Sequence, residues 1–150
     1  MTTRLGYLAV VVATWMMAPL ALAQTPVAAQ TLVKPTELEG VWVGQSLEAA
    51  GTPAPPEAAA LMRFTFRGDR ILIRGNSQNG SEDEVAFTSD TAKTPKQFDF
   101  HTPNGGLITG IYEIKGDVLT VCMRRGEGPR PADFNTTGGP LIKIVFKKAS

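Results

Sequence analysis

Residues that could act as metal ligands or nucleophiles are few in this chain. It has one histidine, His101, and one cysteine, Cys122, so a zinc site of the usual histidine and cysteine composition cannot be assembled. No serine lies in a Gly-x-Ser-x-Gly setting, and His101 alone would have to activate any of these: Ser46, Ser77, Ser81 or Ser89. We therefore expect no catalytic residues, no metal and no cofactor, and we interpret His101 as an exposed side chain at a strand end.

Acidic side chains are concentrated in one polar segment, Asn79 to Glu84. The segment lacks the alternating spacing of an EF-hand loop, so we interpret it as a solvated hairpin loop rather than a cation site. Asp99, Glu113 and Asp133 are candidates for paired carboxylates in acid and base catalysis, and nothing in the sequence places them together. The glycine-rich segment Gly126 to Arg130 contains and precedes prolines and is followed by no helix pattern, which indicates a long loop rather than a phosphate site.

The N-terminal segment has the features of a secretory signal peptide. Arg4 precedes an apolar run from Leu5 to Met17, and Ala21-Leu22-Ala23 has the small-x-small form of a cleavage site. The apolar run is shorter than the roughly 20 residues of a membrane span, so a retained anchor is the weaker interpretation. We expect cleavage after Ala23 and an exported protein, periplasmic or secreted, with a signal peptide over 1–23, a flexible leader over 24–36 and one folded domain over 37–148.

Removing Arg4 with the signal peptide leaves a formally neutral chain, because the full chain has 15 basic and 14 acidic residues. A neutral chain has no overall field to attract nucleic acid or an anionic membrane, so we expect neither as a partner and no membrane insertion after cleavage. With a single cysteine no intramolecular disulfide can form. Cys122 lies in the apolar run Val118 to Met123, which favours a buried, inert thiol over a reactive or intermolecular one.

Short apolar runs follow one another from Glu37 onward, at intervals of roughly ten residues, as in small all-β domains. In several runs apolar and polar residues alternate, as Phe64 and Phe66 do with their neighbours, which predicts an antiparallel sheet with one buried face. The predicted strands are Val41 to Leu47, Met62 to Arg67, Arg70 to Arg74, Glu84 to Thr88, Gln97 to His101, Ile108 to Lys115, Val118 to Arg124 and Leu141 to Lys147.

Connections between these strands are short. Gly68 and Gly116 each stand in a tight turn that indicates a hairpin between neighbouring strands. One helical turn is expected at Pro56 to Leu61, where proline pre-sets the first turn and alanines follow. An open sheet would leave two edges unpaired, and closure removes both. We therefore predict an all-β fold: a single antiparallel barrel of roughly eight strands with one short helical turn after the first strand.

Several blocks of the sequence resemble known patterns. Gly40-Val41-Trp42 resembles the glycine-x-tryptophan signature of lipocalins, whose tryptophan packs across the base of the barrel. A closer resemblance is to a lipocalin-like family of exported proteins, abundant in planctomycetes and of unknown function. It is carried by Phe66 to Asp69, Thr94 to Asp99, Gly110-Ile111-Tyr112-Glu113 through Cys122, and Arg130-Pro131-Ala132-Asp133-Phe134. The resemblance spans Leu38 to Phe146 and implies a lipocalin-like barrel without implying an activity or a ligand; the polar stretch Gly75 to Glu84 departs from it.

Inward-facing aromatic side chains bear on the function. If the alternation holds, the interior receives Phe64, Phe66, Phe87, Phe98, Phe100, Tyr112 and Phe146. Such rings bury roughly 150 to 250 Å² each and can fill a small barrel, although eight strands also leave room for one small ligand. We expect a non-enzymatic binding or scaffold protein, with a small apolar molecule or an envelope protein as partner. The alternative is a protein–protein interaction module of the envelope, including an inhibitor of an exported protease, that acts through its loops.

The candidate ligand-binding residues are Tyr112, Phe100, Arg130 and Phe134. In the long loop that follows Arg124, we expect Arg130 to pair with Asp133 while Phe134 plugs the barrel end, because paired arginine and carboxylate side chains commonly hold such loops. This structural role is favoured over ligand recognition for the loop.

Overall fold

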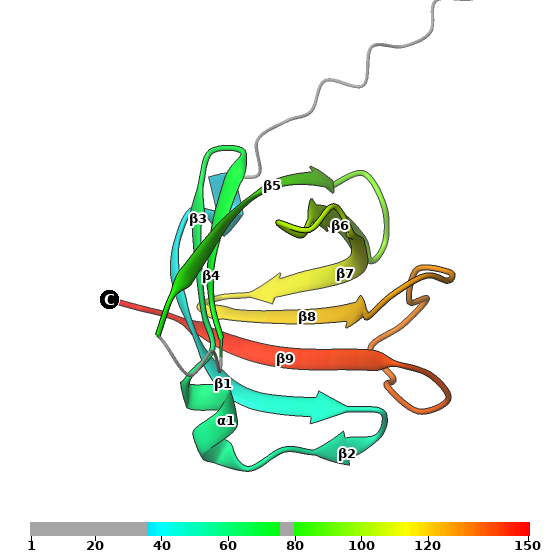
Figure 1. Ribbon diagram of the computed structural model, residues 1–150. Coiled ribbons are helices and arrows are strands. Elements are labelled where there is room, and N and C mark those ends of the chain that lie inside the picture. Colours follow the sequence, from blue (N-terminus) through cyan, green and yellow to red (C-terminus); the bar gives the residue numbers. More distant parts are fainter. Residues whose placement is uncertain (1–35, 76–79) are drawn as a thin grey trace, which may run out of the picture. The chain divides into compact units, whose positions relative to one another are not determined.

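The computed structural model describes residues 36–75 and 80–150, which form a closed antiparallel barrel of eight strands with one extra strand (Figure 1). The predicted signal peptide, its cleavage site and all but the last residue of the leader lie outside the described residues, as do Ser77 and Asn79. The elements are η1 (Thr36–Leu38), β1 (Gly40–Ala49), β2 (Thr52–Pro53), α1 (Pro56–Ala60), β3 (Arg63–Arg67), β4 (Arg70–Arg74), β5 (Glu82–Asp90), β6 (Lys96–His101), β7 (Leu107–Lys115), β8 (Val118–Arg124) and β9 (Leu141–Lys148).

Neighbouring strands pair in the order β2-β1-β3-β4-β5-β6-β7-β8-β9, and an additional pairing of β1 with β9 closes the barrel. The predicted barrel and its short helical turn are therefore confirmed, while the two-residue strand β2 was not predicted. Both predicted glycine turns are present: Gly68 joins β3 to β4 with a φ of 62°, and Gly116 joins β7 to β8 with a φ of 63°.

The prediction of a loop from Asn79 to Glu84 is wrong at Glu82 and Asp83, whereas Glu84 lies in a strand as the predicted strand Glu84 to Thr88 has it. Glu82, Asp83 and Glu84 begin β5 and pair with Arg74, Ile73 and Leu72 of β4. Acidic residues have low strand propensity in isolation, but here the ladder with β4 supplies their backbone partners. Glu82 to Glu84 therefore continue the sheet.

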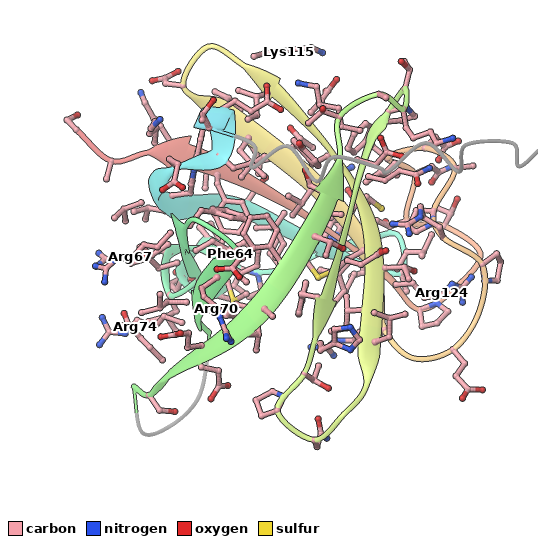
Figure 2. All side chains as sticks on the ribbon, turned by 90° about the horizontal axis from the view of Figure 1, so that it is seen from above. Phe64, Arg67, Arg70, Arg74, Lys115 and Arg124 are labelled. Carbon is pink, nitrogen blue, oxygen red and sulfur yellow. The ribbon has the colours of Figure 1, made fainter. Side chains whose placement is uncertain are left out.

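The alternation predicted along the strands is confirmed by burial. All the aromatic side chains expected inside the barrel are buried and belong to one core cluster. Rings from different strands contact each other, with centroids 4.6 Å apart for Phe64 and Phe146 and 5.2 Å apart for Phe66 and Phe87. Figure 2 shows the contrast between Phe64, inside the barrel, and Arg67 and Arg74, which project outward.

Trp42 lies in this aromatic cluster and is 1% exposed. Its indole nitrogen donates a hydrogen bond of 2.8 Å to the carbonyl of Leu38, and the ammonium of Lys148 lies 5.3 Å from its ring centroid. A buried indole N–H needs an acceptor, and the 3-10 turn η1 provides one. The turn η1 is therefore fastened to the barrel through Trp42.

The helix α1 occupies the place where β1 leaves β3. The two strands pair from Gly40 to Val43, and the Gly44 N–H then donates to the Met62 carbonyl at 2.8 Å. A β-carbon on Gly44 would lie 2.1 Å from the Ala59 carbonyl oxygen, so only glycine allows α1 to approach β1 this closely. Beyond this point β1 continues along β9 after a register shift between Gly44 and Ser46.

A long loop, 125–140, contributes a second buried region outside the barrel core. Ile111 and Cys122 point away from the interior yet are 1% and 0% exposed, and the loop residues Pro131 and Thr136 are buried as well. The Thr136 hydroxyl accepts from the Gly51 N–H at 2.9 Å and donates to the Glu48 carboxylate. The loop is thus tied to the end of β1. Within the described residues no helix is long and apolar enough to cross a membrane.

Candidate functional site

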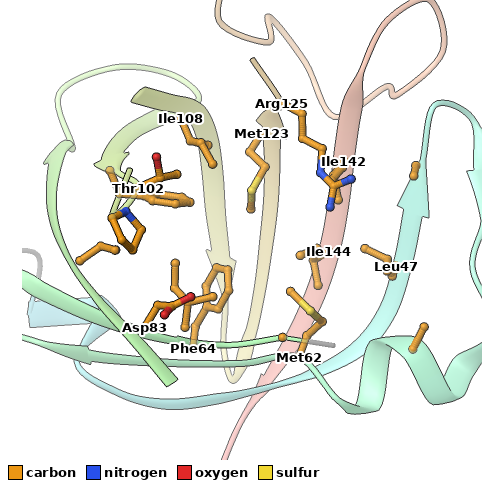
Figure 3. Close-up of a pocket in the computed structure, with 17 residues that line it drawn as sticks. Leu47, Met62, Phe64, Asp83, Thr102, Ile108, Met123, Arg125, Ile142 and Ile144 are labelled. Atoms are coloured by element: carbon orange, nitrogen blue, oxygen red, sulfur yellow. The ribbon is translucent and has the colours of Figure 1, made fainter. Parts of the chain in front are cut away.

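A cavity of about 490 Å³ opens at one end of the barrel (Figure 3). Its walls receive side chains from α1 and from every strand except β2, and most of them are apolar. The larger aliphatic ones are Leu47, Ile73, Val85, Ile108, Ile142 and Ile144. Phe64 and Phe100 form part of the lining, next to the aromatic core. The interior is therefore filled by rings in one half and hollow in the other.

Two departures from regular pairing widen the barrel at this end. The strand β5 pairs with β4 over Glu82–Ala86 but with β6 only over Phe87–Asp90. Beyond the pair Phe87 and Phe100 the two strands have no ladder, and Val85 and Pro103 line the cavity there. On the other side, α1 separates β1 from β3 and presents Ala58 to the cavity. Small and aliphatic side chains at these positions leave space that larger aromatic rings would occupy.

Two charged residues stand among the apolar side chains of the lining, Asp83 and Arg125. Asp83 precedes the inward-facing Val85 by two positions, and Arg125 follows the inward-facing Met123 by two. Since side chains in strands alternate with a period of two, Asp83 lies on the inner side of the barrel wall. Arg125 lies just beyond the end of β8 and also lines the cavity. Figure 3 shows them on opposite sides of the cavity.

Among the residues that the structure describes, neither Asp83 nor Arg125 has an ion-pair or hydrogen-bond partner in its side chain. Both are solvent-exposed, so each charge remains hydrated while the apolar wall lies beside it. Thr102 is another polar residue of the lining, and its hydroxyl already donates a hydrogen bond of 3.1 Å to the Gly106 carbonyl. The cavity therefore combines an apolar interior with two opposite charges that are free to meet a ligand.

Of the residues predicted to bind a ligand, Phe100 lines the cavity. Tyr112 lies in the aromatic half instead, where its hydroxyl donates to Glu37 at 3.1 Å and lies 3.5 Å from the Ser89 hydroxyl. Burial raises the pKa of Tyr112 above its usual value, and the nearby carboxylate of Glu37 adds to the rise while the Ser89 hydroxyl opposes it. Tyr112 holds η1 on the barrel rather than facing the cavity.

Arg130 does not pair with Asp133, as the sequence predicted, but with Asp99 on β6. Its two terminal nitrogens lie 2.6 and 2.9 Å from the two carboxylate oxygens of Asp99. Asp133 instead accepts a hydrogen bond of 2.8 Å from the backbone N–H of Asn135. Asp133, the acidic residue nearest to Arg130 in the sequence, thus forms its hydrogen bond within the loop, while Arg130 binds to the sheet.

Phe134 does not plug the barrel end. It is half-buried and lines a groove of about 340 Å³ formed with residues before and within β6 and with Glu113 and Ile114 of β7. The groove lies outside the barrel core, because Phe134 belongs to the loop 125–140, which crosses the outer side of β7 and β8. Tyr112 also contributes to this groove, so the structure brings Tyr112 and Phe134 together and separates both from Phe100 at the cavity.

Comparisons with protein-family models, with curated proteins and with solved structures gave no match. The assignment of the site consequently rests on its geometry.

The lone histidine and cysteine have the positions that the sequence predicted. His101 is exposed at the end of β6, and Cys122 is buried at the centre of β8. Burial raises the pKa of the Cys122 thiol, which the positive charge of Lys143 only partly offsets. Within the described part of the chain no group of three or more histidine, cysteine or acidic side chains is placed to hold a metal ion.

Sequence reasoning missed Asp83 and Arg125 as site residues. The signal for Asp83 was its spacing of two from Val85, which places it inside the barrel once β5 begins at Glu82 rather than at Glu84. Arg125 follows the last residue of β8 and carries no comparable signal, since its direction depends on the Arg125 N–H donating to the Pro140 carbonyl across the loop base at 2.9 Å.

Proposed function

We propose that the protein is an exported, non-enzymatic binding protein that holds one small, largely apolar molecule in the barrel cavity. The observation that carries this proposal is the cavity itself. Its volume of about 490 Å³ falls within the range of roughly 300 to 1,000 Å³ that ligand pockets occupy. Mostly apolar walls with a few polar groups are also the usual composition of such pockets.

The apolar lining supplies a driving force for binding. A ligand that removes about 200 Å² of apolar surface from water gains about 5 kcal/mol, at about 25 cal/mol for each Å². Part of this gain offsets the lost translational and rotational freedom of the ligand. Because the aromatic half of the barrel is already packed, the walls are largely formed before the ligand arrives, and little further ordering is needed.

The N-terminal signal and the resemblance to a lipocalin-like exported family support the same proposal. An exported carrier has a use for a cavity that shields an apolar molecule from water. The absence of a candidate nucleophile beside His101 gives no support to an enzyme within the described residues, since that side chain projects to solvent at the end of β6. The lipocalin-like assignment itself remains a proposal that rests on the sequence blocks.

The test is a titration with N-phenyl-1-naphthylamine, a neutral apolar dye whose fluorescence rises in apolar surroundings. We expect saturable binding of one dye for each chain. The variant Ile108→Trp, which places a larger ring inside the cavity, should weaken this binding strongly, whereas Leu107→Trp should not. Ile108 lines the cavity while the adjacent Leu107 is 49% exposed on the outer side of the same strand, so the pair differs only in which face receives the new ring.

Native mass spectrometry of the protein from its own envelope complements the titration. A co-purifying small molecule that Ile108→Trp loses and Leu107→Trp keeps would identify the natural ligand. If the dye bound both variants equally, or bound neither the variants nor the original protein, the cavity would not be a binding site. The interaction module, acting through the loops, would then be the better interpretation.

A further inference from the structure

Charged side chains on the outer surface of this barrel are expected, but the cavity lining also includes a carboxylate and a guanidinium. Asp83 pairs in register with Ile73, an apolar residue of the same lining, and Arg125 follows Met123. The neighbours of these two residues in sequence point the other way: Glu82 and Glu84 alternate with Asp83, and Arg124 donates to the Pro129 carbonyl at 2.8 Å. The two inward charges are thus set apart from the outer ones.

Several charges on the outer surface of the barrel form ion pairs, although others among the described residues, such as Arg63 and Glu84, do not. Glu48 pairs with Lys143 at 3.1 Å, Glu37 with Lys96 at 2.6 Å and Asp117 with Lys147 at 3.5 Å. Asp83 and Arg125 have no such partner among the described residues, and they do not pair with each other. Both charges stay hydrated beside the apolar wall of the cavity, and each can form an ion pair when a ligand brings the opposite charge.

On the basis of the proposed function, we infer that the ligand is a zwitterionic amphiphile. Its hydrocarbon part fills the aliphatic cavity, its anionic group meets Arg125, and its ammonium group meets Asp83. A ligand with only an anionic head would satisfy Arg125 but bring a like charge toward Asp83, and a purely cationic head would do the reverse. A neutral head would leave both charges without a partner. Only a head group with both charges complements the two sides of the cavity.

The test compares four molecules that share a saturated chain of the same length: lauroyl lysophosphatidylethanolamine, dodecanoate, dodecylamine and dodecanol. Each competes with N-phenyl-1-naphthylamine for the cavity, at concentrations below micelle formation. We expect the zwitterion to bind up to about fivefold more tightly than either singly charged molecule, which is the upper end of what one solvent-exposed ion pair contributes. Dodecanol should bind more weakly than the zwitterion and report the contribution of the chain alone.

Charge-neutralising variants test which charged group of the ligand each residue binds. Asp83→Asn should remove the advantage of the zwitterion over dodecanoate, and Arg125→Gln should remove its advantage over dodecylamine. Both variants should leave dodecanol binding unchanged. The matched control is Glu84→Gln, which neutralises the next residue of β5 on its outer face and should alter none of the four affinities. Thermal unfolding followed by tryptophan fluorescence checks that each variant keeps the fold.

The outcomes separate this inference from the proposed function. If dodecanol binds as tightly as the zwitterion, or if neither charge variant changes the ranking, the inference is wrong although the cavity still binds apolar molecules. If dodecanoate binds most tightly and Arg125→Gln alone weakens it, the ligand is anionic and the inference is likewise overturned. If none of the four displaces the dye because the dye itself does not bind, the proposed function fails as well.

Discussion

Arg130 and Asp99 form a two-point ion pair that fastens the long loop to the outer face of the barrel. In addition to its contacts of 2.6 and 2.9 Å with Asp99, the Arg130 guanidinium donates to the carbonyls of Phe98 and Gly110 at 2.9 and 2.8 Å. These carbonyls belong to directly opposed residues of β6 and β7. A single planar side chain therefore joins the loop to two neighbouring strands.

Arg130→Ala should lower the free energy of unfolding by about 2 kcal/mol, because the half-buried Asp99 loses its ion pair and a hydrogen bond from a charged donor. Asp99→Asn should lower the free energy of unfolding by less, since the amide oxygen can still accept a hydrogen bond from Arg130. The control is Glu113→Gln, which breaks the exposed pair of Glu113 with Lys115 and should change stability by less than about 0.5 kcal/mol. Urea unfolding followed by tryptophan fluorescence measures all three, and an Arg130→Ala value as small as that of the control would refute the role of Arg130.

The partner of Arg130 could not have been identified from the sequence. The residues of β6 alternate, so Asp99 could be assigned to the outer face between Phe98 and Phe100, but which loop crosses that face depends on the path of residues 125–140. Proximity in the sequence favours Asp133 as the partner of Arg130. In the structure the Asp133 carboxylate instead accepts a hydrogen bond from the Asn135 N–H. Period-two alternation fixes which side of a strand a residue faces, and it carries no information about a long irregular loop.

Gly44→Ala should destabilise the barrel by about 1 to 3 kcal/mol, because the new methyl group would overlap the Ala59 carbonyl and force α1 away from β1. Gly75→Ala is the matched control. A β-carbon at Gly75 would lie 3.5 Å from the Met62 sulfur, an ordinary contact, so its effect on stability should stay within about 0.5 kcal/mol. Thermal melts of the two variants provide the measurement. Equal melting temperatures for both would show that α1 does not need the close approach at Gly44.

Tyr112 should make the stability of the protein fall at alkaline pH. Its folded-state pKa lies above the usual value near 10, so above about pH 10 the unfolded chain loses the phenol proton while the folded protein keeps it. The free energy of unfolding contributed by this group is therefore fully present below pH 10 and declines as the pH rises further, by at most about 1.4 kcal/mol for each pH unit. Tyr112→Phe removes the ionisation and should flatten this part of the profile.

The measurement for Tyr112 is the difference between the unfolding free energies of the original protein and Tyr112→Phe at a series of alkaline pH values. Taking the difference cancels the titration of the lysines, which are common to both. At neutral pH the variant should be modestly less stable, because Glu37 loses one hydrogen-bond donor but keeps Lys96. A difference that does not change with pH would show that Tyr112 titrates at its ordinary value in the folded protein.

The hollow half of the barrel marks the limit of what the sequence pattern predicts. Alternation placed the aromatic residues inside and suggested that they fill the interior, but it does not give their height along the barrel axis. The rings cluster around Trp42 and Phe146, while the positions near the other end are aliphatic, such as Ile73 and Ile108. The cavity also depends on where the β5 and β6 ladder stops, which is a tertiary feature.

Cys122 should be unreactive in the folded protein. Its side chain is fully buried on the outer face of β8, and burial raises the pKa of the thiol, so both access and the population of thiolate are low. Ellman's reagent should therefore leave the native protein unmodified and should titrate one thiol only after denaturation. Introducing an exposed thiol by Ser46→Cys on β1 provides the internal control: this thiol should react rapidly, while Cys122 in the same molecule reacts at the rate of unfolding. Rapid reaction of two thiols in native Ser46→Cys would contradict a closed cover of loop 125–140 over β8 and would revive the alternative of a reactive cysteine.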